Sequence, residues 1–231
     1  MREIVFDTET TGLDPKLGDR MVEIGCVEVD NRVPTGATFH AYYNPERDMP
    51  IEAEQVHGLS SAFLADKPLF ADEADALLEF LGDSPLVAHN AGFDFGFLNS
   101  ELAMCGRKPI DMDRMVDTVA IARKKHPGAK VSLDALCNRY GVDRSHRVKH
   151  GALLDAELLA QVYLELLGGR QIGLVLDAGN DAADTIDPAA AVKQVERIFR
   201  QPRTHQPSAE ELERHQAFMN EFDSPLWNGR N

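Results

Sequence analysis

Two carboxylates, Asp7 and Glu9, are the residues whose types and spacing most directly indicate chemistry. They follow an apolar run at residues 4–6 and stand two positions apart, so in a strand both point to the same face. Like charges this close repel or raise each other's pKa, unless a cation lies between them. The pair therefore predicts a metal site at a strand end. The alternative is a strand that ends at the surface with both acids solvated.

Asp94 is a third candidate ligand, at the first turn of a helix expected after a short apolar strand. The neighbouring Phe93, Phe95 and Phe97 indicate a packed site rather than an open surface. The alternative is an acid that only interacts with the positive end of the helix dipole.

Asp155 is a fourth candidate, and its position carries the most information. Its spacing places it on one helix face with Leu159, Val162 and Leu166. A carboxylate on an apolar, core-facing stripe is costly unless it is paired or bound to metal. The alternative is an acid at the edge of the stripe that reaches water from the first turn.

His150 precedes Asp155 by five residues, and in one continuous helix the two would point about 140° apart. If they share a site, His150 must lie in the loop before the helix, where Gly151 gives the backbone freedom. A neutral imidazole beside a metal site suits a general base. The alternative is an exposed loop histidine between basic neighbours.

The combined set of four acids and one histidine, without cysteine, favours Mg²⁺ or Mn²⁺ over zinc. A carboxylate cluster that holds two such ions is typical of in-line displacement at phosphorus. The sequence therefore predicts two-metal phosphodiester chemistry.

The elements that must position these side chains follow from hydrophobic periodicity. Three strands with short connections indicate an antiparallel meander, and alternating helices and short strands follow it. The expected strands are 3–9, 21–29, 37–43, 86–88 and 115–116, and the expected helices are 71–81, 93–105, one that ends near 125, 132–140 and 152–167. This order predicts an α/β domain over residues 1–170, with a mixed sheet flanked by helices.

A flexible C-terminal extension is expected after that domain. Residues 171–207 are interpreted as a linker with a short helix near 188–200, and residues 208–231 as a tail. Residues 208–211 have the form of a capping box that starts a helix to about Phe222. Apolar residues continue to Leu226 and Trp227.

Composition narrows the class of protein. The chain has 231 residues, 43% of them hydrophobic, and a formal net charge of −14, which argues against charge-driven binding along duplex DNA. Three widely spaced cysteines fit a reducing compartment. With no apolar run long enough for a membrane span and no signal-peptide pattern, a cytoplasmic protein is expected.

Three stretches match a known pattern in order and spacing. Residues 7–12 (DTETTG), 89–94 (HNAGFD) and 150–155 (HGALLD) resemble the motifs of the DEDD-type 3′→5′ exonucleases with a histidine in the third motif. Within that superfamily, residues 132–137 (SLDALC) and the C-terminal extension resemble the proofreading subunits of bacterial replicative DNA polymerases.

The resemblance implies a ribonuclease H-like fold and assigns roles to the candidate residues. It implies that two Mg²⁺ or Mn²⁺ ions are bound, that His150 deprotonates the attacking water, and that Glu52 and His57 contact the terminal nucleotide. The implied metal ligands are Asp7, Glu9, Asp94 and Asp155, of which Asp7, Glu9 and Asp155 also contact the substrate.

The resemblance also implies partners. Residues 171–176 (QIGLVL) look like a sliding-clamp-binding segment, although they could equally pack back on the domain. The tail, residues 208–231, would dock on the polymerase catalytic subunit, and a small self-packed helix is the alternative.

The leading functional hypothesis is an enzyme of the DNA polymerase holoenzyme that removes mispaired 3′-terminal nucleotides from DNA. One alternative is an RNA-trimming exonuclease of the same superfamily, against which the tail argues. Another is a non-catalytic adaptor between polymerase and clamp, against which the complete set of acids argues.

Overall fold

The computed structural model describes residues 1–145, 150–169 and 206–221. The chain divides into two units, residues 1–176 and 177–231. The segment 171–176, the helix expected near 188–200, and Leu226 and Trp227 lie outside the described residues. The elements are β1 (Arg2–Thr10), η1 (Pro15–Leu17), β2 (Met21–Asp30), β3 (Val33–Tyr42), α1 (Ile51–His57), α2 (Ser61–Leu64), α3 (Phe70–Leu81), β4 (Leu86–Ala88), α4 (Gly92–Met104), η2 (Met112–Arg114), β5 (Met115–Asp117), α5 (Thr118–Lys125), α6 (Leu133–Tyr140), α7 (Ala152–Leu166) and α8 (Ala209–Met219).

The described strands form one five-stranded mixed sheet in the order β3-β2-β1-β4-β5. β1, β2 and β3 pair antiparallel, whereas β4 pairs parallel with β1 and β5 parallel with β4. The predicted meander and mixed sheet are confirmed. β3 begins at Val33, earlier than expected, because the hairpin turn is only Asn31 and Arg32, both with positive φ.

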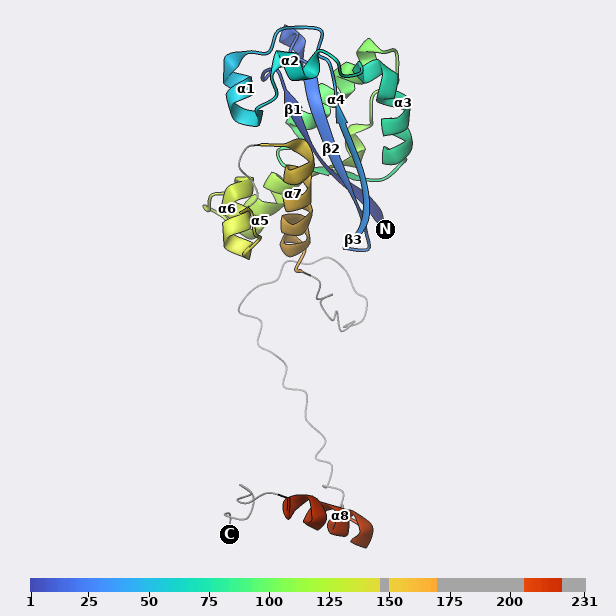
Figure 1. The fold of residues 1–231 in the computed structure, drawn as a ribbon, viewed down its shortest axis with the longest axis vertical. Helices are drawn as coiled ribbons and strands as arrows, with labels where there is room; N and C mark the ends of the chain where they lie inside the picture. The colour runs from blue at the N-terminus through green and yellow to red at the C-terminus, as the bar shows by residue number, and fades with distance from the viewer. Residues whose placement is uncertain (146–149, 170–205, 222–231) are drawn as a thin grey trace, which may run out of the picture. The chain divides into compact units, whose positions relative to one another are not determined.

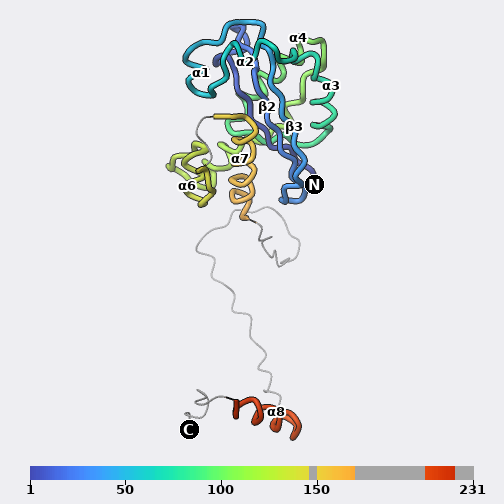
Figure 2. The backbone as a smooth tube through the Cα atoms, viewed as in Figure 1, coloured from blue at the N-terminus to red at the C-terminus, as the bar shows by residue number. Residues whose placement is uncertain are grey.

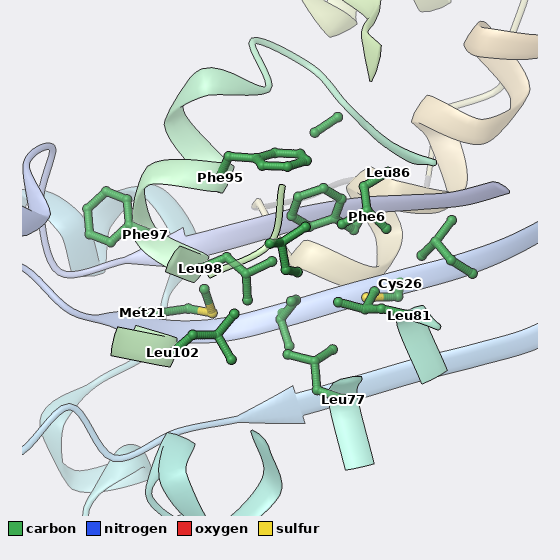
Figure 3. Packing of buried hydrophobic residues seen from close by; sticks show 14 of the residues in the cluster. Phe6, Met21, Cys26, Leu77, Leu81, Leu86, Phe95, Phe97, Leu98 and Leu102 are labelled. Atoms are coloured by element: carbon green, nitrogen blue, oxygen red, sulfur yellow. The ribbon is translucent and has the colours of Figure 1, made fainter. Parts of the chain in front are cut away.

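Helices cover both faces of the sheet, as Figure 1 shows. On one face, Ile4 and Phe6 of β1 pack with residues of α3 and α4. Phe6 and Phe95 meet edge to face with ring centroids 5.9 Å apart, and Figure 3 shows them in this core. Val5, which lies between Ile4 and Phe6 in β1, points to the opposite face of the sheet and packs against α7. This alternation makes β1 fully buried along its middle.

α7 is covered on its outer side by α5 and α6, which explains why its stripe is buried so completely. Leu159, Val162 and Leu166 are at most 4% exposed, so the predicted core-facing stripe is confirmed. Ser132 caps α6 at its start and Gly141, in the left-handed region, ends it, close to the expected bounds of 132–140.

The short helices α1 and α2 were not predicted and connect β3 to α3. α1 begins after Pro50, carries Glu52 and Glu54 in its first turn, and stops at Gly58, which has a φ of 81°. These are ordinary start and stop signals, but seven residues are too few for a clear apolar period. Figure 2 shows α1 and α2 at one end of the sheet and the N-terminus toward the other.

α8 belongs to the second unit. Ser208 and Glu211 form the predicted capping box, and the helix ends at Met219, slightly before the expected end. None of the helices within the described ranges is long and apolar enough to cross a membrane.

Candidate active site

β1 carries the first two candidate ligands into the centre of the sheet. Glu9 is 8% exposed and Asp7 is half-buried. Both belong to the face of β1 that α7 covers, because they alternate in register with Val5. The strand end therefore lies against α7 and not in open solvent.

A close backbone contact fixes the start of α7 above this strand end. Gly25 of β2 pairs with Asp7 in the ladder. A Cβ atom at Gly25 would lie 2.2 Å from the Leu153 nitrogen and 2.4 Å from the Ala152 carbonyl carbon. Only glycine permits this approach. The contact places Asp155, which is 2% exposed, on the same side of the sheet as Glu9.

His150 lies outside α7, as predicted, because the helix cap is Gly151. Its Nδ1 is 3.2 Å from Asp155 Oδ2, and about half of its side chain is exposed. Its backbone N–H donates to the Val56 carbonyl of α1 at 3.4 Å. Glu9, His150 and Asp155 offer ligand atoms that all lie within 4.8 Å of one another.

Asp7 and Asp94 lie outside that group of three. Asp94 is 3% exposed, and its Oδ1 accepts a hydrogen bond from Thr8 Oγ1 at 2.8 Å. Burial raises the pKa of the Asp94 carboxyl to about 7, and the bond from Thr8 opposes that rise. The carboxyl is therefore poised between its charged and neutral forms near neutral pH, without a bound cation.

The loop between β4 and α4 sets the position of Asp94. Asn90 has a φ of 66°, and its N–H donates to Asp117 Oδ1 at 3.1 Å. The His89 ring contacts Thr118 Oγ1 at 2.9 Å, and burial lowers the pKa of His89. These bonds attach the second motif to the start of α5.

A cleft of about 490 Å³ opens beside the acids. Glu52 and His57 line it from α1, and the His57 Nδ1 accepts a hydrogen bond from the Leu59 N–H at 3.0 Å. The walls of the cleft are formed mostly by apolar side chains and backbone atoms. The lining residues are Thr8, Glu9, Thr10, Thr11, Gly12, Leu13, Pro50, Glu52, Ala53, Val56, His57 and Phe93.

Buried carboxylates so close together fit a bound cation. Glu9 and Asp155 are both nearly inaccessible, and two such charges are costly in one place unless a positive charge neutralises them. Oxygen donors with one imidazole suit a hard divalent ion. The arrangement can therefore hold a divalent metal at the side of a cleft large enough for part of a nucleotide.

Several residues that shape the site were not singled out from the sequence. Gly25, inside a largely apolar strand, carried the usual signal of close backbone approach. Thr8 and Asp117 act through long-range hydrogen bonds, and no local pattern indicates them. Leu13 carried no signal in the sequence.

The fold and the acidic cluster together define a phosphodiester-cleaving enzyme of the ribonuclease H-like class. The exonuclease family model (RNase_T) matches residues 4–163. A solved complex of Exonuclease X with 5′ overhanging duplex DNA superposes with a TM-score of 0.57 at 26% identity, over 72% of this chain and 91% of that one. An E. coli ExoI–ssDNA complex has the same fold, with a TM-score of 0.63 at 18% identity over 74% of this chain and 41% of that one.

Curated relatives narrow the class. DNA polymerase III subunit epsilon of Rickettsia conorii is 48% identical over 95% of both chains. That of Escherichia coli K12 is 47% identical over 73% of this chain and 72% of its own. The chain belongs to the DNA polymerase III subunit epsilon family. This membership confirms the predicted fold, and it confirms the predicted class of proofreading 3′→5′ exonuclease. Exonucleases of this fold use divalent metals, and the acidic cluster agrees with that.

Proposed function

We propose that the chain hydrolyses the last phosphodiester bond of a DNA 3′ end with two Mg²⁺ or Mn²⁺ ions, and that it edits mispaired termini for a replicative polymerase. The observation that carries this proposal is the group formed by Glu9, His150 and Asp155, within 4.8 Å of one another beside the cleft. The group combines two buried acids with a half-exposed histidine, and the cleft beside it has room for a substrate.

The metal-holding residues are Asp7, Glu9, Asp94 and Asp155. Glu9 comes from β1 and Asp155 from α7, and α7 is placed by its contact with Gly25 of β2, the strand that pairs with β1. Asp94 can bind metal only when its carboxyl is deprotonated; burial raises the pKa of that carboxyl, and a bound cation lowers it again. When bound, the two ions supply water activation and charge neutralisation at the phosphate.

His150 acts as the general base. If its Nδ1 carries the proton, it donates to Asp155 Oδ2, 3.2 Å away, and the other ring nitrogen is left with a lone pair. Asp155 thereby orients the ring as well as binding metal. The half-exposed ring has access to water and can release the proton to solvent after each turnover.

The terminal nucleotide binds in the cleft. Glu52 and His57 supply polar contacts from α1, and Val56, Phe93 and Leu13 give apolar surface for the base and sugar. Asp7, Glu9 and Asp155 border the scissile phosphate. Apolar contacts with the base and sugar suit a chain with a net charge of −14, because such a chain has no overall electrostatic attraction to the DNA phosphates.

The test is nucleotide release from labelled single-stranded DNA and from RNA of the same sequence, with Mg²⁺ or Mn²⁺. Asp7→Ala with Glu9→Ala removes two ligands, and we expect no detectable release. Glu28→Ala with Asp30→Ala is a matched control, because it removes two acids at the same spacing from the far part of the sheet. No release from either substrate by the wild type contradicts the proposal, and release from RNA alone favours the RNA-trimming alternative.

The number of ions is a separate measurement. Calorimetric titration with Mn²⁺ should give two ions per chain at pH 8, and Asp155→Asn should lose at least one. A single site in the wild type, with full activity at that occupancy, would contradict the two-ion proposal.

The partners follow from the relatives, which are polymerase subunits. We assign residues 1–170 to the exonuclease domain, 171–207 to a linker and 208–231 to the docking tail. Within the tail, α8 presents Leu212 and Phe218, each more than half exposed, as apolar contacts for the polymerase. Residues 171–176 are proposed to bind the sliding clamp.

Deletion of residues 178–231 tests this division. Nucleotide release should remain within about twofold of wild type, because all site residues are retained, and co-elution with the polymerase catalytic subunit should be lost. Tight binding by the truncated chain would refute the assignment of the tail. Gln171→Ala with Leu174→Ala should weaken co-elution with the clamp and leave co-elution with the polymerase catalytic subunit unchanged.

A further inference from the structure

The loop of residues 11–19, called here the rim loop, follows β1 and borders the cleft. Gly12 and Leu13 of this loop line the cleft, and the Leu13 side chain is 84% exposed. A substrate in the cleft therefore touches the rim loop. A loop with so exposed an apolar tip needs support from elsewhere to keep one position.

The base of the rim loop is closed by paired hydrogen bonds. The Thr11 N–H donates to the Arg20 carbonyl at 2.9 Å, and the Arg20 N–H donates to Thr11 Oγ1 at 3.0 Å. Above this base, a Cβ at Gly12 would lie 2.2 Å from Asp19 Oδ2, so the two arms of the loop are in contact. Asp19 Oδ2 also accepts from the Asp14 N–H at 3.1 Å.

An inner anchor fixes the base to α4. The Arg20 guanidinium donates to both oxygens of Glu101, at 2.8 and 2.9 Å, and to the Pro45 carbonyl at 3.2 Å. Glu101 is 2% exposed and also accepts from the Met21 N–H at 3.0 Å. A bidentate, desolvated pair of this kind has one geometry. The start of β2 is thereby fixed relative to α4.

An outer anchor holds the far arm. Arg47, in the segment after β3, donates to the Gly18 carbonyl and to Asp19 Oδ1, the latter at 2.9 Å. About a third of the Arg47 side chain is exposed. Both anchors hold the arm of the rim loop that leads into β2, the outer one at Gly18 and Asp19 and the inner one at Arg20, and none of these bonds involves a metal-binding acid.

We propose that Arg20, Glu101 and Arg47 are positioning residues that hold the rim loop against the DNA 3′ end and so set the affinity for substrate. The inference rests on the proposed function. Because the anchors act through Gly12 and Leu13, their loss weakens binding of the terminus and leaves the chemical step unchanged. The expected signature is a raised KM with an unchanged kcat.

Steady-state nucleotide release from a single-stranded oligonucleotide tests this. Arg47→Gln removes the outer anchor at a partly exposed site where folding is not at risk. We expect KM to rise about three- to tenfold, as expected when a charge-assisted hydrogen bond is lost, with kcat within about twofold. Arg47→Lys should restore part of the affinity, because it keeps one charged donor.

Arg107→Gln is the matched control. Arg107 is exposed to a similar degree as Arg47 (41% against 35% of the side chain) and pairs with Asp75, which is more exposed than Asp19. Both of its bonds to Asp75 are 2.7 Å long and join α3 to the segment just after α4. Its KM should equal that of the wild type. Glu101→Gln breaks the inner anchor and should raise KM further if the protein folds, and Arg47→Gln decides the question if it does not.

An unchanged KM for Arg47→Gln would overturn the inference, and so would a fall in kcat without a rise in KM. Either is distinguishable from failure of the proposed function, because the wild type in the same assay must release nucleotides. A rise in KM for Arg107→Gln equal to that for Arg47→Gln would also refute it, since any lost surface pair would then have the same effect.

Discussion

The contact between Gly25 and the first turn of α7 yields the sharpest prediction. In Gly25→Ala the added methyl group meets the Leu153 nitrogen at 2.2 Å and its Cα at 2.3 Å, whereas tight contacts begin near 3.0 to 3.4 Å. Both partners are backbone atoms, so no side chain can rotate away. α7 or β2 must therefore move by roughly 1 Å.

That displacement has two measurable costs. Overpacking of this kind typically destabilises by about 1–3 kcal/mol, which corresponds to a Tm lower by roughly 2–12 °C for a domain of this size. The same shift carries Asp155 and His150 away from Glu9, and a misplacement of about 1 Å in a catalytic group lowers the rate by about 10²-fold. We expect kcat for nucleotide release to fall by that order.

The control is Gly96→Ala. Gly96 lies on the exposed side of α4, and a Cβ there meets nothing within 4 Å. This variant should keep its kcat and gain about 0.5–1 kcal/mol of stability from the lost backbone freedom. If Gly25→Ala loses stability but keeps its kcat, the close contact does not position the site and the reasoning is refuted.

Three further predictions concern other parts of the chain. Burial raises the pKa of Asp94 to about 7, so native metal-free protein binds more protons than unfolded chain above about pH 4, and its stability falls as pH rises toward 7. Asp94→Asn should therefore raise the Tm in EDTA at pH 8 but not at pH 4, and an equal gain at both would contradict this. His150→Gln should lower kcat by about 10²- to 10⁴-fold and leave Mn²⁺-dependent oligonucleotide binding, measured by fluorescence anisotropy, near wild type. Ser208→Ala should reduce the helicity of a peptide of residues 206–221 by circular dichroism, because the cap is worth about 1 kcal/mol, and unchanged helicity would mean that the capping box contributes nothing.

Local sequence patterns were sufficient to predict most of the fold and the central residues of the candidate site. The alternation through Glu9 indicated a strand with two acids on one face, and the stripe below Asp155 indicated a buried carboxylate. Both are properties of a few adjacent residues, so they can be seen in a sequence. The need to place His150 before its helix came from helical geometry alone and is confirmed.

What could not be predicted depends on contacts between distant segments. Thr8 bonds to Asp94 across 86 positions, and Arg20 meets Glu101 across 81. Nothing in either neighbourhood specifies the partner. α1 was not predicted because its seven residues are too few to show a helical period of apolar residues, although Pro50 and Gly58 mark its two ends. The nucleotide-side residues were therefore assigned from the family resemblance and not from chemistry.

One backbone hydrogen bond links the two halves of the site. The His150 N–H donates to the Val56 carbonyl, so the proposed base is tied to the helix that carries Glu52 and His57. Through this bond, a displacement of α1 is expected to shift the base as well. A terminus that fits badly in the cleft should thus be processed slowly as well as bound weakly. Discrimination between 3′ ends that fit the cleft well and those that fit badly would then appear in kcat, because the position of α1 depends on that fit.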